Sequence, residues 1–313
     1  MQFKIIINQQ YQIPSINLIN ADSFCEVEVF CFGAILNKFS IINNGKIFNV
    51  IDAYENTEDA IEQKNTWFKS CKLSPFVCRL QDGMYEWNNI KYTINKFYLG
   101  KNAMHGLVYD AVYNIIKTEE TSEFALVKLQ HQYTATDAGY PFNFTINIIY
   151  KLEKNNKLTI TTIVLHNNPI AIPYCDGWHP YFKLDEPIDN CTLQFDADEL
   201  LEFDEHLIPT GVVTSDDKFI NEVLLKNIEL DNCYILNKNK QSKCVLKSNN
   251  LKLSILPKSS YKYLQVFIPD HRKNIAIENL STAPNAFNNK MGLSILEPNK
   301  KYVFETSLVL ENC

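Results

Sequence analysis

Arginine is scarce in this chain. Lysine and arginine together contribute 30 of the 313 residues, and Arg79 and Arg272 are the two arginines. Because arginine is the side chain best suited to bidentate recognition of phosphate, a site built around several phosphate groups is disfavoured. The net charge of −6 and an isoelectric point near 5.6 also argue against a nucleic-acid partner, whose phosphate backbone attracts basic proteins.

Long apolar runs and paired cysteine motifs are missing as well. No stretch approaches the roughly 18 apolar residues of a membrane-spanning helix, and the N-terminal segment has only the short run Ile5–Ile7. We therefore expect neither a membrane span nor a secretion signal. The nine cysteines are odd in number and include no C-x-x-C pair, a pattern that favours reduced thiols in a cytoplasmic protein over disulfides or a metal centre.

The chain is dominated by an apolar period of two, which predicts strands. Residues 144–152 and 158–164 each alternate along one face, and Asn155-Asn156 between them suits a tight turn. Similar short runs recur along the chain, separated by Asn, Asp, Gly and Pro. Many short strands at regular spacing indicate a large antiparallel β-sandwich.

Residues 57–70 are the exception, because they predict a short helix. Thr57 is a candidate N-cap, acidic residues follow it, and apolar side chains recur near helical spacing as far as Trp67 and Phe68. No linker, charge block or repeat divides the chain. We therefore expect one all-β domain over residues 1–313, with minor helix.

Five polar positions interrupt the strand pattern. Each has an ordinary explanation as a surface, turn or core residue, but functional groups are often found where alternation breaks. They are Arg79 before the Asp82-Gly83 turn; Asn102 with His105-Gly106; His179 between Trp178 and Pro180-Tyr181; Asp231-Asn232; and Glu278 after the run Ile275–Ile277.

Taken in order, these positions resemble the aldose 1-epimerase (galactose mutarotase) family over residues 75 to 290. The resemblance is carried by the following residues: Pro75-Phe76 with Arg79 and Gly83, His105-Gly106, His179 with Tyr181-Phe182 and Leu184, Ile208–Gly211, Asp231–Cys233, and Glu278 with Pro284, Ala286 and Asn288.

The resemblance implies a β-supersandwich with one open cleft, in which the α and β anomers of a free hexose interconvert without metal or cofactor. Glu278 would be the general base and His179 the general acid, with His105 near the ring oxygen. Arg79 and Asp231 would hold sugar hydroxyls. A monomer or homodimer is expected.

Three further side chains are candidates for binding the sugar: Asn102, Trp178 and Tyr181. The two rings could stack on its apolar face. We also expect a carboxylate beside His179 to raise the pKa of that imidazole and favour the charged donor.

Three other functions remain open from the sequence. A hexose-6-phosphate mutarotase would need further cations, for which Arg272 and Lys273 are the candidates. A non-catalytic sugar-binding protein could use the same fold. A glycosidase with Glu278 and Asp231 as its carboxylates would leave both histidines without a role.

Overall fold

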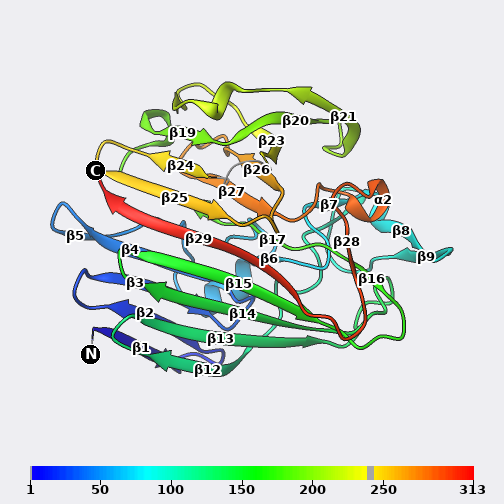
Figure 1. Cartoon of the computed structure of the whole chain (residues 1–313), viewed down its shortest axis with the longest axis horizontal. Coiled ribbons are helices and arrows are strands. Elements are labelled where there is room, and N and C mark those ends of the chain that lie inside the picture. The colour runs from blue at the N-terminus through cyan, green and yellow to red at the C-terminus, as the bar shows by residue number, and fades with distance from the viewer. Residues whose placement is uncertain (1, 238–242) are drawn as a thin grey trace.

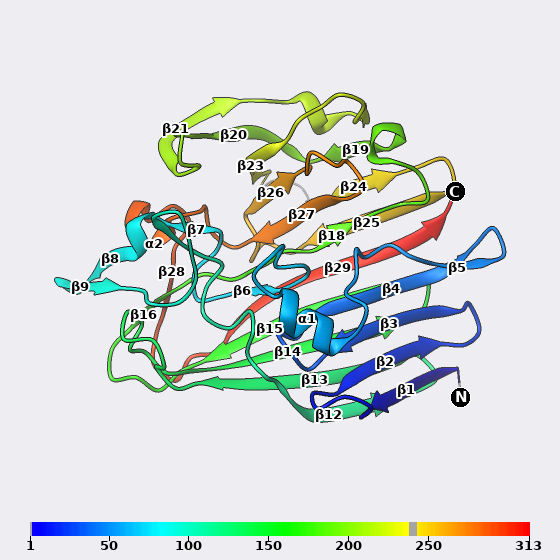
Figure 2. The ribbon, with the colours of Figure 1, turned by 180° about the vertical axis from the view of Figure 1, so that it is seen from behind.

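The computed structural model describes residues 2–237 and 243–313. Its large sheets are antiparallel and packed in layers, which confirms the predicted all-β sandwich (Figures 1 and 2). One broad sheet of nine strands forms one layer. Two further sheets, of five and eight strands, lie against it. The functional side chains predicted from the sequence map mainly to the eight-stranded sheet and to the loops beside it.

In Figure 1 the nine-stranded sheet extends from β12 at the bottom of the molecule to β19 near the top. Its strands, in spatial order, are β12 (Asn114–Glu120), β13 (Phe124–Tyr133), β14 (Phe144–Glu153), β15 (Lys157–Leu165), β29 (Tyr302–Asn312), β25 (Leu251–Pro257), β24 (Cys244–Lys247), β19 (Thr192–Phe195) and β22 (Val223–Leu224).

The predicted hairpin lies at the centre of this sheet. β14 and β15 pair in register, and the turn residues Asn155 and Asn156 both have positive φ, of 58° and 50°. Asparagine tolerates this left-handed conformation better than most residues. The alternating apolar side chains are buried as expected, for example Ile146 and Leu158.

The five-stranded sheet covers one half of the broad sheet, with β2 against β13 and β14 (Figure 2). Its strands are β1 (Phe3–Asn8), β2 (Ser15–Asn20), β3 (Cys25–Phe30), β4 (Leu36–Asn43) and β5 (Lys46–Asn49).

The eight-stranded sheet comprises β21 (Pro209–Ser215), β20 (Ala197–Phe203), β23 (Asp231–Leu236), β26 (Tyr263–Phe267), β27 (Ile275–Leu280), β17 (Gly177–Trp178) and β6 (Lys72–Leu73), with β18 (Tyr181–Phe182) also paired to β27.

Small elements complete the chain. The remaining strands are β7 (Arg79–Leu80), β8 (Met84–Trp87), β9 (Ile90–Thr93), β10 (Tyr98–Leu99), β11 (Asn102–Met104), β16 (Ile172–Tyr174) and β28 (Ser294–Leu296), and the helices are α1 (Thr57–Gln63), α2 (Ala286–Asn289) and the 3-10 turns Gln81–Gly83, Ile188–Asn190 and Lys218–Ile220. Neither α-helix within the described ranges has the length that a bilayer crossing requires.

The predicted helix is shorter than expected. Its N-cap lies one residue earlier than expected, at Asn56 rather than Thr57, and the Asn56 side chain accepts a hydrogen bond from the Asp59 N–H. It ends at Gln63, so Trp67 and Phe68 lie outside it. Phe68 itself has a φ of 52°, which no α-helix accommodates.

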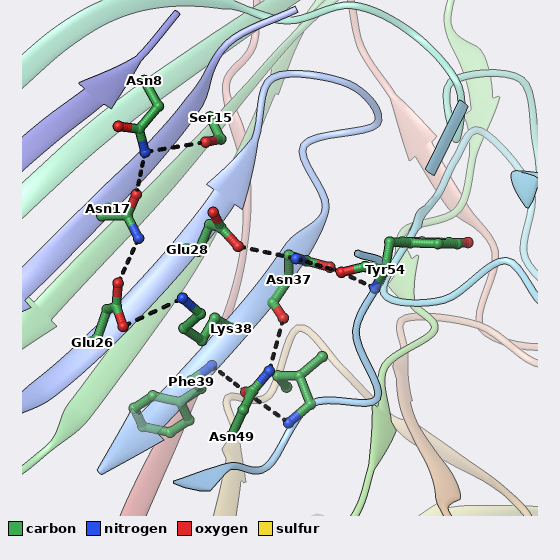
Figure 3. A network of polar contacts seen from close by, with 11 residues as sticks. Asn8, Ser15, Asn17, Glu26, Glu28, Asn37, Lys38, Phe39, Asn49 and Tyr54 are labelled. Carbon is green, nitrogen blue, oxygen red and sulfur yellow. Dashed lines mark hydrogen bonds and ion pairs between the residues drawn. The ribbon is translucent and has the colours of Figure 1, made fainter. Parts of the chain in front are cut away.

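One face of the five-stranded sheet is polar, whereas the other belongs to the core (Figure 3). Asn17 lies in the middle of this polar row, accepting a hydrogen bond from Asn8 Nδ2 and donating one to Glu26, each over 2.7 Å. Glu26 also pairs with Lys38 at 3.4 Å. The alternation that buries Val27 therefore aligns amides and charges on its opposite side.

Candidate active site

A cavity of about 240 Å³ opens beside the eight-stranded sheet. It gathers six of the eight side chains that the sequence predicted, namely Arg79, His105, His179, Tyr181, Asp231 and Glu278. These residues come from five separate stretches of the chain. Their convergence makes this cavity the candidate site.

Strand register brings the polar side chains of the floor together. Glu278 of β27 lies opposite Gln265 of β26, and Gln265 lies one strand away from Asp231 at the start of β23. Gln265 Nε2 donates to Asp231 Oδ1 over 2.8 Å. Among the described residues, Gln265 Oε1 has no hydrogen-bond partner, so it is an acceptor available to a bound molecule.

Gln265 was not predicted as a site residue. The signal was present, because a glutamine stands inside the apolar stretch 263–268. The sequence of one strand does not reveal which residue of the neighbouring strand lies opposite a polar side chain. The structure shows that Gln265 lies opposite Glu278.

His179 is held rigidly next to Glu278. Its backbone N–H donates to Cys71 O over 3.1 Å, and its carbonyl accepts from Ser70 N over 2.8 Å. His179 Nε2 lies 3.4 Å from Glu278 Oε1. The ring of Tyr181 packs beside the imidazole with centroids 5.1 Å apart. An imidazole and a carboxyl thus face each other directly in the cavity.

His105 occupies a strained turn beside this pair. Its φ is 60°, and its N–H donates to Cys78 O over 2.8 Å, which ties the turn to the segment that carries Arg79. Gly106 follows because a Cβ there would lie 2.2 Å from Ser74 O. The His105 ring lies 5.0 Å from that of His179, and its Nδ1 has no partner in the described part of the chain.

Burial dominates the electrostatics of the cavity. It raises the pKa of Glu278 well above its usual range and lowers the pKa of His179 to about 4. It also holds the pKa of His105 well below the ordinary value, and the neighbouring His179 and Arg79 add to this effect. The pKa of His179 is therefore lowered, not raised as expected, because desolvation has the largest effect and the Arg79 charge acts in the same direction.

These shifts predict that both cavity histidines are neutral at pH 6. Burial penalises the imidazolium, so His179 should bind its proton only as the pH falls from 6.5 towards 4. Histidine ¹⁵N NMR of the folded protein should show this titration, with signals assigned through His179→Gln and with the exposed His206 as reference. A His179 ring already protonated at pH 6 would contradict the prediction.

Arg79 contributes an arginine guanidinium group to the cavity. It is partly exposed and lines the wall, and in residues 2–237 and 243–313 its guanidinium donates no hydrogen bond. Its charge lowers the pKa of Asp231, although burial has the larger and opposite effect. Free guanidinium donors opposite a carboxylate form a site that suits vicinal hydroxyl groups.

Trp178 and Asn102 do not line the cavity. Trp178 points into the sandwich, where its ring lies over Lys72 Nζ at 4.4 Å. Neighbouring residues of an extended segment face opposite sides, so Trp178 cannot share the side of His179. Asn102 Oδ1 instead accepts from Asp82 N and supports the turn after Arg79. The sugar-binding role expected of these two side chains has no support in their positions.

The sequence analysis did not predict several other residues of the cavity lining. Trp67 and Phe68 line the cavity from the segment that was expected to be helical. Cys78 also lines it, with Sγ 3.9 Å from Glu278 Oε2. Arg272, by contrast, is bound elsewhere, with its guanidinium 2.7 Å from Asp189.

The layered sheets and this cavity define a protein with the galactose mutarotase-like fold. A galactose mutarotase-like protein from Clostridium acetobutylicum superimposes with a TM-score of 0.86, over 100% of this chain and 99% of the other, at 19% sequence identity. At that identity the likeness establishes the fold.

The family follows from the sequence match. The model of the family described as aldose 1-epimerase matches residues 14–309, so this chain belongs to the aldose 1-epimerase family, whose members are isomerases. The protein YihR of Escherichia coli K12, described as uncharacterized, is 27% identical over 238 residues, which is 74% of this chain and 75% of YihR. The aldose 1-epimerase of Streptococcus thermophilus is 27% identical over 189 residues, or 57% of this chain and 52% of that enzyme.

Proposed function

We propose that this protein is an aldose 1-epimerase that interconverts the α and β anomers of a free aldose. The observation that carries the proposal is the contact between His179 Nε2 and Glu278 Oε1, 3.4 Å apart inside a cavity. A proton donor and a proton acceptor side by side are what ring opening of a cyclic sugar needs.

The rest of the cavity suits the hydroxyl groups of a sugar. The Arg79 guanidinium offers donors, while Asp231 and Gln265 Oε1, which has no partner among the described residues, offer acceptors. Because each sugar hydroxyl both donates and accepts, mixed groups of this kind can hold it from several sides. They would orient the anomeric carbon towards Glu278 and His179.

In the proposed reaction the Glu278 carboxylate removes the proton from the anomeric hydroxyl as the bond between C1 and the ring oxygen breaks. The charged His179 gives a proton to the ring oxygen, and an open-chain aldehyde results. After rotation about C1–C2, His179 takes the proton back and Glu278 returns its own, so the ring closes as the other anomer.

The low pKa of His179 is compatible with this sequence of steps. A neutral pair with the proton on Glu278 and an ionised pair with the proton on His179 contain the same number of protons. The raised pKa of Glu278 and the lowered pKa of His179 favour the neutral pair, with the proton on Glu278, in the empty cavity. The hydrogen-bond groups of a bound sugar would stabilise the ionised form, whereas the Arg79 charge favours the Glu278 carboxylate and disfavours the His179 imidazolium.

A phosphorylated sugar fits this cavity less well. Arg79 is the cationic side chain in the lining, whereas Asp231 and Glu278 are both acidic. Arg272, the other candidate for a phosphate, donates to Asp189 and to two backbone carbonyls. A dianionic group would meet carboxylates without a second cation to balance it.

Anomer exchange measured by NMR across free and phosphorylated hexoses tests the proposal. We expect exchange of glucose or galactose to be accelerated, and hexose 6-phosphates to be turned over at least tenfold less efficiently, because their charge is unbalanced in this cavity. The absence of acceleration for every sugar would refute the enzymatic function. A preference for the phosphates would instead establish the phosphate-specific alternative.

A further inference from the structure

The two oxygens of the Glu278 carboxyl group have different neighbours. Oε1 lies 3.4 Å from His179 Nε2, whereas Oε2 lies 3.9 Å from the thiol sulfur of Cys78. Apart from His179, this thiol is the only hydrogen-bond donor that contacts the Glu278 side chain within residues 2–237 and 243–313. A carboxylate can accept about four hydrogen bonds, so the ionised form of this buried group is poorly satisfied.

Cys78 reaches Glu278 through a left-handed backbone turn. Its φ is 48°, a conformation that is uncommon for a residue other than glycine, asparagine or aspartate. Its carbonyl accepts a hydrogen bond from His105 N over 2.8 Å, and the next residue, Arg79, lines the cavity. The turn at Cys78 thus links three residues of the site, namely His105 through the backbone, Glu278 through the thiol and Arg79 as its neighbour in the chain.

The Cys78 side chain is a neutral and weak donor. Burial raises the pKa of its thiol well above the usual range, and the nearby Glu278 adds to the effect, so the sulfur keeps its proton. An S–H group donates more weakly than a hydroxyl group. The thiol lowers the pKa of Glu278, but by less than burial and the Asp231 charge raise it. Cys78 therefore holds Oε2 while it stabilises the carboxylate charge only slightly.

The other ionisable groups around Glu278 do not supply the missing donor. With Cys78 they are Cys71, Arg79, His105, His179, Tyr181, Asp231 and Cys233. Cys71 and Cys233 are buried thiols, and burial raises the pKa of each. Arg79 is the cation of the group, and it lowers the pKa of Glu278 by less than burial and Asp231 raise it. These surroundings favour a protonated Glu278 in the empty cavity.

We propose that Cys78 is a positioning residue for anomer exchange: its thiol holds Oε2 so that Oε1 faces His179, and its weakness as a donor leaves the carboxyl group protonated until a sugar binds. The inference rests on the proposed function, because Glu278 is the base of that reaction. When the sugar binds, the proton moves from Glu278 Oε1 to His179 Nε2. One O–H bond breaks and one N–H bond forms, so no group outside the pair gains or loses a proton.

Cys78→Ser is expected to shift the alkaline limb of kcat/KM for glucose to lower pH by about one unit, because a hydrogen bond from a hydroxyl stabilises a carboxylate more than one from a thiol. The hydroxyl can donate directly or through a water in the space that the shorter side chain leaves. The pair loses its one proton at the higher of its two pKa values, which is that of Glu278. Polarimetry between about pH 5 and 9 measures this limb.

Cys78→Ala removes the contact with Oε2 and tests the positioning itself. Its kcat should fall about fivefold and its KM should change less than about twofold, the scale of one lost hydrogen bond, whereas Cys78→Ser should retain the original kcat. Cys191→Ser is the matched control, because the buried Cys191 thiol donates to the Pro187 carbonyl over 3.5 Å and lies outside the described cavity lining. It should change neither kcat nor the alkaline limb.

An unshifted alkaline limb in Cys78→Ser, or an unchanged kcat in Cys78→Ala, would overturn the role of Cys78, as would the same effects in Cys191→Ser. Should the original protein exchange no sugar at all, the proposed function fails, and ¹³C NMR of protein with labelled glutamate side chains decides the inference instead. The Glu278 carboxyl signal, assigned through Glu278→Gln, must then titrate at lower pH in Cys78→Ser than in the original protein. Equal titration midpoints in the two proteins overturn the inference.

Discussion

Glu278→Gln is expected to abolish anomer exchange while the protein stays folded. Glutamine keeps the size and shape of the side chain in its buried position on β27, but its amide cannot take up the proton of the anomeric hydroxyl. General acid–base groups contribute roughly 10²–10⁴-fold to a rate, so kcat/KM for a free hexose should fall by about 10³-fold. Polarimetry on freshly dissolved α-glucose measures this loss directly.

The stability of the variant is the necessary companion measurement. A buried amide costs less to desolvate than a carboxylate, so thermal unfolding should occur at or slightly above the temperature of the original protein. Glu86→Gln makes the same chemical change at an exposed position on β8 and should leave turnover unaltered. Near-normal activity of Glu278→Gln would exclude this carboxyl group as the base.

Lys72→Met is expected to cause the largest loss of stability. Lys72 and Asp176 form an ion pair in which both side chains are 0% exposed. Lys72 Nζ also donates to Thr162 Oγ1 of β15 over 2.9 Å, which joins β6 of one layer to the other. Burial lowers the pKa of Lys72 to about 8 and raises that of Asp176, because the interior penalises both charges.

Removing the lysine leaves the Asp176 carboxylate without its counter-ion. Breaking a buried pair in this way costs about 3–5 kcal/mol, so the midpoint of thermal unfolding should fall by roughly 5–8 °C. In Lys72→Met/Asp176→Asn most of this loss should return, because the amide oxygen of asparagine can still accept from Tyr261, which donates to Asp176 Oδ1 over 2.8 Å.

A surface pair provides the matched control. Lys252 and Glu311 lie 2.9 Å apart, but both remain partly exposed. Lys252→Met should therefore cost less than about 1 kcal/mol. If Lys72→Met proves no more destabilising than Lys252→Met, then burial of the ion pair makes no measurable contribution to folding.

Local patterns were sufficient to predict the strands. The run that became β14 alternates so regularly that its buried face could be read from the sequence, and the Asn155-Asn156 turn fixed the hairpin. The helix was overextended because the apolar positions Trp67 and Phe68 matched its period. A positive φ at Phe68 reflects contacts with distant parts of the chain, which no local pattern contains.

The cavity residues also divide into those that local patterns identify and those that only contacts between distant parts of the chain identify. Glu278 and His179 were selected because each breaks an apolar pattern locally, and the structure brings both to one cavity, although their catalytic roles remain a proposal. Trp178 was misplaced because composition alone does not say which side of a strand a ring takes. Gln265 was missed because its importance arises from the strand opposite it.

The sequence by itself determined the all-β class and the side chains with chemistry to offer, because alternation and turn residues act over a few neighbouring positions. Only the tertiary structure decided which of those side chains meet, that Trp67 rather than Trp178 reaches the cavity, and that His179 favours its neutral form. The pairing register between distant strands determines which side chains meet and which tryptophan reaches the cavity. The exclusion of water by residues far apart in the chain lowers the pKa of His179.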